Sequence, residues 1–158
     1  MATEIERKFL VVGDEWRHLA VGTPFHQGYL SRDPDRTVRV RVAGESAYLT
    51  IKGRTHGLSR QEFEYPIPAL DALALLAICD GPLIEKTRYV VEHRGHRWEI
   101  DEFSGDNSGL VLAEVELLEV NEAVDLPPWV GREVSDDPRY YNSNLAVNPF
   151  CRWARTST

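Results

Sequence analysis

The chain has 158 residues, of which 42% are hydrophobic and 27% charged, and its formal net charge is −7. This composition is too apolar for a disordered chain and is typical of one globular domain, which we expect to span residues 1–158. The acidic balance argues against sequence-independent binding to nucleic acid, which requires a basic surface. Phosphate binding would need a local cluster of bases or a metal ion.

Two further features bear on the compartment. The sequence holds no apolar run near the roughly 18 residues of a membrane span, and it begins with a charged stretch rather than the apolar segment of a signal peptide. Cys79 and Cys151 are the only cysteines and lack metal-finger spacing, so we interpret them as two reduced thiols. We therefore expect a cytoplasmic protein without a membrane partner.

Alternation of apolar and polar residues predicts eight strands, most of them joined by short turns. In chain order these strands are 4–12, 24–31, 36–42, 47–53, 60–67, 83–93, 96–103 and 110–118. A single helical turn is predicted over 15–19, between the first two strands. Most neighbouring strands should therefore be antiparallel.

Helical patterns are few. An amphipathic helix is predicted over 69–79, where Leu70, Leu73, Ala74 and Ala77 share one face. After the last strand we expect a short helix over 119–125, then a break at two prolines. A C-terminal helical segment over about 144–158, interrupted by a further proline, completes the chain.

The charged residues of these strands fall on one face and are sorted by strand. The first strand carries both signs, the third and sixth strands carry pairs of bases, and the fifth, seventh and eighth carry pairs of acids. The bases are Lys8, Arg39, Arg41, Lys52, Lys86 and Arg88, and the acids are Glu4, Glu6, Glu62, Glu64, Glu99, Asp101, Glu114 and Glu116.

Two architectures fit this alternation. In an open sheet the charged face would meet solvent and the apolar face would form the core. In a closed barrel the charged face would line the interior. Sorting by sign and the single amphipathic helix, which is too small to cover eight strands, favour the barrel. We predict an α+β, mainly β fold: a closed eight-stranded antiparallel barrel with a charged interior, room for one small ligand, and a few helices packed outside.

The motif Glu4-Ile5-Glu6-Arg7-Lys8 resembles the ExExK signature of the CYTH superfamily, the triphosphate tunnel metalloenzymes. The resemblance covers about residues 1–148, and the small bacterial inorganic triphosphatases are the members most similar to this chain. The remaining matching motifs, in order, are Arg39-Val40-Arg41, Thr50-Ile51-Lys52, Glu62-Phe63-Glu64, Glu85-Lys86-Thr87-Arg88-Tyr89, Glu99-Ile100-Asp101 and Glu114-Val115-Glu116.

The resemblance implies a tunnel that binds linear triphosphate and hydrolyses its terminal phosphoanhydride to pyrophosphate and phosphate. Bases of both arginine and lysine type would bind the substrate, namely Lys8, Arg39, Arg41, Lys52, Lys86 and Arg88. Lys8 and Lys52 would lie near the scissile oxygen and, with Glu114, form the catalytic group.

The carboxylates imply metal ions, because acids cannot face a polyanion without cations between them. Oxygen ligands of this kind favour Mg²⁺, with Mn²⁺ as the alternative, and two ions are expected. Glu4, Glu6 and Glu116 would hold one ion. Asp101 and Glu114 would hold the other, whose bound water would be the nucleophile. Glu62, Glu64 and Glu99 would contact ions through water or pair with bases, and Tyr29 would either reach the tunnel or only pack.

Other functions are compatible with the same tunnel. A class IV-type adenylate cyclase or a thiamine or nucleoside triphosphatase would need a pocket for an organic group, which no motif here specifies. A non-catalytic triphosphate- or polyphosphate-binding module would not need so many carboxylates. We expect a monomer or homodimer without nucleic acid, and a segment after Pro149 that plugs one tunnel mouth or is a disordered terminus.

Overall fold

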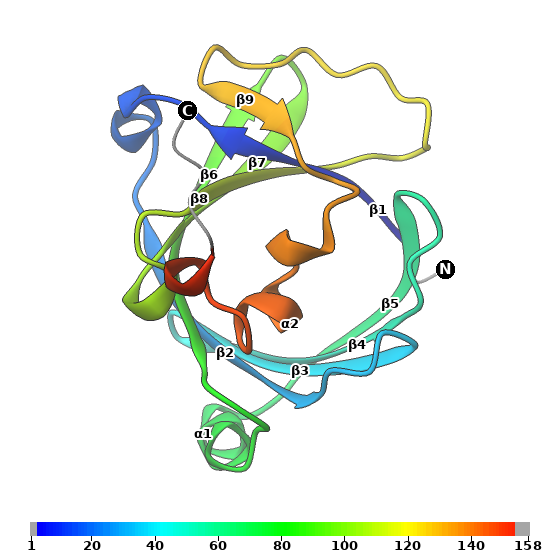
Figure 1. The fold of residues 1–158 in the computed structure, drawn as a ribbon, viewed down its shortest axis with the longest axis vertical. Coiled ribbons are helices and arrows are strands. Elements are labelled where there is room, and N and C mark those ends of the chain that lie inside the picture. The colour runs from blue at the N-terminus through cyan, green and yellow to red at the C-terminus, as the bar shows by residue number, and fades with distance from the viewer. Residues whose placement is uncertain (1–2, 154–158) are drawn as a thin grey trace.

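A computed structural model describes residues 3–153 and has at its centre an antiparallel sheet that closes into a barrel (Figure 1). The strands are β1 (Thr3–Val11), β2 (Thr23–Ser31), β3 (Arg36–Ala43), β4 (Ser46–Gly53), β5 (Ser59–Pro66), β6 (Ile84–His93), β7 (His96–Phe103) and β8 (Val111–Glu116). Their order is β5-β4-β3-β2-β6-β7-β8-β1, and pairing of β1 with β5 closes the circle. The predicted eight-stranded antiparallel barrel is confirmed.

The strand β1 divides one of its edges between two partners. Thr3–Ile5 pair with β5, whereas Phe9 and Val11 pair with a short ninth strand, β9 (Val130–Glu133), that the sequence pattern did not predict. Between them, the Glu6 N–H donates to the Leu58 carbonyl at 3.2 Å and the Lys8 N–H donates to Ser135 Oγ at 2.9 Å. The N-terminal motif is thus hydrogen-bonded along its whole length.

The helices differ from the prediction toward the C-terminus. The helix predicted over 69–79 is present as α1 (Ala69–Ala77), and the predicted turn after β1 is the 3₁₀ helix η1 (Glu15–His18). The prediction of a helix over 119–125 is wrong. This segment is a loop, in which the Glu122 carboxylate accepts a hydrogen bond from the Leu118 N–H and contacts His96. Further short elements are η2 (Gly105–Asn107), η3 (Pro138–Tyr140), α2 (Asn142–Leu145) and η4 (Phe150–Arg152).

The helix α1 packs with the face opposite to the predicted one. Ala72 is fully buried and, with Leu75 and Leu76, packs over Val40 and Ala47 on the outside of the barrel. Leu70 and Leu73 of the predicted stripe are 81% and 59% exposed. The helix has apolar residues on nearly every side, so its periodicity could not select the buried face.

A larger apolar cluster covers the outside of β1, β6, β7 and β8. Trp98 lies fully buried at its centre, 5.6 Å from the ring of Phe9 and 5.7 Å from that of Trp129. Trp16 of η1 and Leu117 complete the cluster. One helical turn and the long loop before β9 therefore cover this side, in place of the expected helix.

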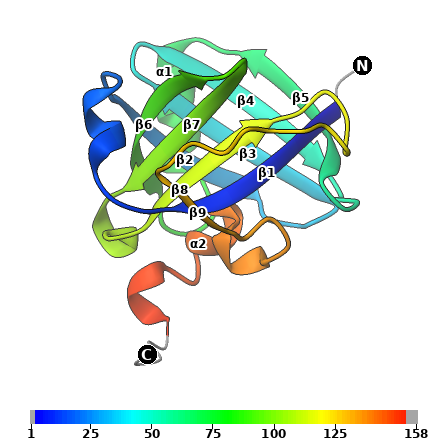
Figure 2. The same cartoon turned by 90° about the horizontal axis from the view of Figure 1, so that it is seen from above.

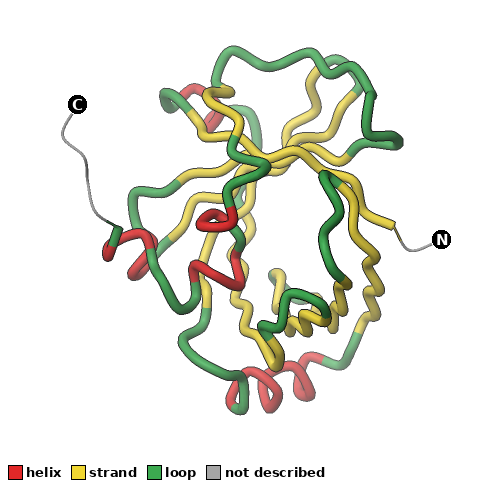
Figure 3. Tube along the Cα trace, turned by 45° about the vertical axis from the view of Figure 1, so that its right-hand side comes forward, coloured by secondary structure: helices red, strands yellow, loops and turns green. Residues whose placement is uncertain are grey.

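Residues 134–146, which we call the plug segment, follow β9 and lie across one opening of the barrel (Figures 1 and 2). Tyr140, Leu145 and Ala146 of this segment form a buried cluster with the barrel residues Phe103 and Leu112. The trace in Figure 3 shows these short helices beside the strands they cover. For the segment after Pro149 the sequence left a plug or a disordered terminus open; its described residues Phe150 and Trp153 pack against the same cluster. Residues 154–158 of the predicted C-terminal helix lie outside the described part.

Within residues 3–153, no helix is both long and apolar enough to cross a membrane.

Candidate active site

The inside of the barrel holds a cavity lined almost entirely by polar and charged side chains. The loop between β4 and β5 and the plug segment complete its walls. The predicted site residues that line it are Glu4, Glu6, Lys8, Tyr29, Arg39, Arg41, Lys52, Lys86, Arg88 and Glu114. Among the lining residues that the structure describes, only Tyr29, Leu58 and Tyr141 have large apolar or aromatic side chains.

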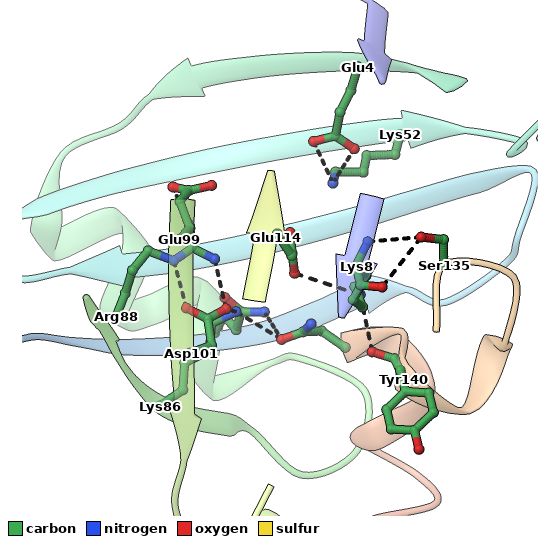
Figure 4. Close-up of polar contacts among 12 residues, drawn as sticks. Glu4, Lys8, Lys52, Lys86, Arg88, Glu99, Asp101, Glu114, Ser135 and Tyr140 are labelled. Atoms are coloured by element: carbon green, nitrogen blue, oxygen red, sulfur yellow. Dashed lines mark hydrogen bonds and ion pairs between the residues drawn. The ribbon is translucent and has the colours of Figure 1, made fainter. Parts of the chain in front are cut away.

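Lys8 and Glu114 lie opposite each other on β1 and β8 (Figure 4), with Lys8 Nζ 3.7 Å from Glu114 Oε1. Lys8 Nζ also donates to the Tyr140 carbonyl of the plug segment at 3.2 Å. Burial opposes the charged form of Lys8, but Glu114 and Glu6 raise the lysine pKa above its usual range. Burial likewise opposes ionisation of Glu114, but Lys8, Arg88 and Lys86 together outweigh it, and the pKa of Glu114 falls to about 2. Both groups are therefore charged at neutral pH.

A second contact group joins β1, β4 and β5. Lys52 Nζ donates to Glu4 Oε1 at 3.1 Å and lies 3.4 Å from Glu62 Oε2. Burial would raise the pKa of Glu4, but Lys52 holds it below its usual range. Glu64 accepts from Thr50 at 2.8 Å and lies 3.4 Å from Arg39. The carboxylates of β5 thus pair with bases, one of the two roles expected for them.

Asp101 lies beneath the cavity rather than in its wall. Arg88 donates to both Asp101 oxygens, at 2.7 and 2.9 Å, and Lys86 Nζ is 2.8 Å from Oδ2. Asp101 is only 1% exposed, and Arg88 also donates to Glu99 at 3.0 Å. Burial opposes ionisation of Asp101, but Arg88 and Lys86 hold its pKa far below the usual range. These contacts give Asp101 the position of an anchor for two bases.

Burial lowers the pKa of Lys86 to about 7; Asp101 opposes this change, whereas Arg88 and Arg41 add to it. Arg41 shows the same effect, because burial together with Arg39 and Arg88 lowers its pKa to about 9. A bound polyanion would reverse both shifts. The inner part of the cavity is therefore a region of excess positive charge.

Two arginines of the cavity have no carboxylate within 4.0 Å among residues 3–153, namely Arg41 and Arg60. Arg41 Nε donates to Gln27 at 2.9 Å, and Arg60 donates to the Gly53 carbonyl and to Thr37 Oγ1. Sequence reasoning missed Arg60, although it continues the inward alternation of Glu62 and Glu64 along β5. Both guanidinium groups are available to an anion.

Four acidic side chains face one another across neighbouring strands. Glu6 lies opposite Glu116, and Glu99 lies opposite Glu114. Burial, Glu114 and Glu4 raise the pKa of Glu6 well above its usual range, and burial with Glu4 and Glu99 raises that of Glu116. Like charges placed directly opposite each other are destabilising. A cation bound by these carboxylate oxygens would reduce the repulsion between them.

The carboxylate oxygens of these residues are ligands that suit a hard divalent cation. In this structure, however, the side chains do not converge on a single point. In the described part of the chain, no three acidic, histidine or cysteine side chains surround one ion position. Glu4 is held by Lys52, and Glu6 and Glu116 form no ion pair within 4.0 Å in residues 3–153. Binding would therefore require rotation of these carboxylates toward one another.

A closed antiparallel barrel with bases and carboxylates facing a polar interior is the architecture that the resemblance to the triphosphate tunnel metalloenzymes predicts. The CYTH domain model matches residues 2–141, and the chain belongs to the CYTH family.

Several relatives are similar over almost the whole chain. An inorganic triphosphatase from Acetivibrio thermocellus is 50% identical over 151 residues, covering 95% of this chain and 97% of that protein. One from Nitrosomonas europaea is 41% identical over 150 residues, covering 92% and 98%. The crystal structure of an inorganic triphosphatase has a TM-score of 0.63 and 36% identity, covering 90% and 97%. A protein from Pyrococcus horikoshii, at TM-score 0.56 and 18% identity over 75% and 80%, shares the fold.

Proposed function

We propose that this chain is an inorganic triphosphatase, which hydrolyses the terminal phosphoanhydride of linear triphosphate to pyrophosphate and phosphate. The observation that carries the proposal is a cavity inside the barrel with an excess of bases, including Arg41, which has no carboxylate within 4.0 Å among residues 3–153. Relatives of 50% and 41% identity that are named inorganic triphosphatases support it.

The substrate-binding role is proposed for Lys8, Arg39, Arg41, Lys52, Lys86 and Arg88, and we add Arg60 to this set. A linear triphosphate carries several negative charges along its length, so burying it requires hydrogen-bond donors along the whole triphosphate. Arginines supply paired N–H groups that match two phosphate oxygens at once. Arg41 and Arg60 suit this role because no carboxylate competes for their donors within residues 3–153.

For the metal we propose Mg²⁺, with Mn²⁺ as the alternative. Glu4, Glu6 and Glu116 would hold one ion, and Glu114 would contribute to a second. When bound, such ions neutralise phosphate charge and activate a water molecule. We now assign Asp101 to the positioning of Arg88 and Lys86, because both of its oxygens are bonded to these bases. Glu99 accepts one hydrogen bond from Arg88, and we assign it to the positioning of that base.

Two lysines are proposed to stabilise the leaving pyrophosphate. Phosphoryl transfer depends mainly on positioning and on charges placed where negative charge develops. Lys8 has its ammonium group held by Glu114 and the Tyr140 carbonyl, so its direction is set before substrate binds. Lys52 is held by Glu4, and it would be released when that carboxylate turns to a metal ion.

The cavity favours an inorganic substrate over a nucleotide or thiamine triphosphate. Apolar side chains of the plug segment pack at one opening of the barrel, and Tyr29 and Tyr141 are the only aromatic side chains among the described residues that line the cavity, which leaves few surfaces on which a base could stack. The test is to incubate the protein with triphosphate, ATP and thiamine triphosphate, each with and without Mg²⁺ or Mn²⁺, and to identify the products. Cyclic AMP from ATP, or binding of triphosphate without phosphate release, would contradict the proposal.

We further propose that the chain is a single domain that acts in the cytoplasm as a monomer or homodimer. We also propose that it does not bind nucleic acid. Cys79 and Cys151 are free thiols, which agrees with a reducing compartment.

A further inference from the structure

A chain of neutral amides connects two bases of the cavity to the plug segment. Asn142, the first residue of α2, accepts at Oδ1 from Lys86 Nζ at 2.9 Å and from Gln27 Nε2 at 3.1 Å. Gln27 in turn accepts at Oε1 from Arg41 Nε at 2.9 Å. Gln27 is fully buried, and Asn142 lines the cavity. One amide on the plug segment therefore reaches bases on both β3 and β6.

The directions of these hydrogen bonds are fixed by the cations at the two ends. An ammonium or guanidinium group only donates, so each amide must turn its oxygen toward its cation. Gln27 then has its amide nitrogen left to donate to Asn142, whose oxygen has two lone pairs to accept both bonds. The arrangement is consistent in only one orientation, which gives both bases a defined direction.

The amides set the direction of the bases without neutralising them. Lys86 has three N–H donors, of which Asn142 and Asp101 engage two. Arg41 uses Nε on Gln27, which leaves its two terminal nitrogens to bind an anion side by side. A carboxylate at position 142 would hold Lys86 equally well but would add a negative charge next to the substrate.

We infer that Asn142 is a positioning residue for substrate binding, acting on Lys86 directly and on Arg41 through Gln27. The inference rests on the proposed function and extends it from the barrel strands to the plug segment. Packing of Leu145 and Tyr140 against the barrel holds α2 in place, so the plug segment sets the geometry of the bases as well as closing the opening.

The test compares three variants of the full chain. Asn142→Ala should raise the Kd for triphosphate about tenfold, measured by calorimetry without divalent cation, and lower kcat/KM by roughly ten- to a hundredfold with Mg²⁺. Asn144→Ala is the matched control, since Asn144 lies on the same helix and bonds the Pro138 carbonyl instead of a base. It should stay within about twofold of wild type in both measurements.

Asn142→Leu separates positioning from shape and also serves if the alanine variant fails to fold, because leucine has a similar volume but accepts no hydrogen bond. If the residue only filled space, this change would leave the Kd unchanged. We expect the Kd to rise about tenfold instead, because Lys86 and Gln27 lose their acceptor. Wild-type Kd and kcat/KM in Asn142→Ala, or a wild-type Kd in Asn142→Leu, would overturn the inference. Lack of phosphate release by the wild-type chain would overturn the proposed function, whereas the comparison of Kd values would still decide the role of Asn142.

Discussion

Lys8 Nζ and Glu114 Oε1 lie 3.7 Å apart across the β1–β8 pair, and each group favours the charged form of the other against the cost of burial. The contact places an ammonium group at the cavity wall between the Glu114 carboxylate and the Tyr140 carbonyl. It also makes the two residues interdependent, because removing either leaves a buried charge without its partner.

Lys8→Met should therefore reduce kcat for triphosphate by about a hundredfold or more, the usual loss when a donor to developing charge is removed. Arg7→Met is the control, since Arg7 is the next residue but bonds Glu133 on the outside of the barrel at 2.8 Å. We expect the control to keep its turnover in a phosphate-release assay. A Lys8→Met variant with near wild-type turnover would contradict the catalytic assignment.

Glu6→Gln should raise the Tm of the metal-free protein. The pKa of Glu6 is raised in the folded state, so folded chains bind more protons than unfolded ones between its usual and its raised value. Stability therefore falls as pH rises through that window, and glutamine removes this penalty. Each kcal/mol regained corresponds to a Tm increase of roughly 2–4 °C.

The same variant tests the metal site. Mg²⁺ should raise the Tm of the wild-type protein at pH 7.5 more than at pH 5, where protons compete for the carboxylates. Glu6→Gln should lose most of this increase, whereas Glu45→Gln, in an exposed turn, should keep it. An equal response of all three proteins to Mg²⁺ would remove Glu6 from the metal site.

Asp101→Asn should destabilise the protein by about 3–5 kcal/mol in urea unfolding without metal, because it breaks a buried pair with Arg88 and leaves Lys86 with a neutral neighbour. This is opposite in sign to the effect expected for Glu6→Gln. If Asp101 were a metal ligand that stabilised no base, Asp101→Asn would instead leave the metal-free stability unchanged and alter only the response to Mg²⁺. That second result would restore Asp101 to the set of metal ligands.

The affinity for triphosphate should fall between pH 6 and pH 8 as Lys86, with a pKa of about 7, loses its proton. Because the folded pKa lies below the usual value near 10.4, Lys86 also makes stability rise with pH from about 7 upward. Lys86→Arg keeps its charge across this range and should show a flatter Kd profile by calorimetry. Parallel profiles for the two proteins would show that Lys86 does not titrate in the free site.

Leu145→Ala should cost about 2–5 kcal/mol of folding free energy, because Leu145 is fully buried in the cluster that seats the plug segment. Val147→Ala, at a position that is 39% exposed, should change stability by less than about 0.5 kcal/mol. Urea unfolding measures both. Equal effects would mean that the plug segment is not held by this cluster.

Alternation predicted the eight barrel strands because period two is a strong signal when one face is apolar and the other charged. It also predicted most of the inward bases and acids, since nine of those fourteen positions line the cavity. The short strand β9 and the plug segment carry no repeated pattern, so their places depend on tertiary contacts such as Val134 N–H to the Lys8 carbonyl at 2.8 Å.

The position of Asp101 could not be predicted for a different reason. The prediction that Asp101 is an inward-facing acid on this strand is correct. Whether an acid lies opposite a base or opposite another acid, however, depends on the register between neighbouring strands. Asp101 lies near Arg88, whereas Glu6 lies opposite Glu116, and sequence alternation treats both alike. The buried face of α1 was similarly undetermined, because apolar residues surround that helix.

The divided edge of β1 has a consequence for the order in which the barrel assembles. Its partners are residues 59–61, 112–116 and 130–133, so every hydrogen-bonded neighbour of the first strand is made much later than the strand itself. Pairings between distant parts of a chain form slowly, because loop closure must precede them. During synthesis the edges of β1 therefore cannot be fully paired until β9 has been made. The Glu4–Lys8 motif, which is made before every other part of the site, is thus among the last parts of the site to be completed.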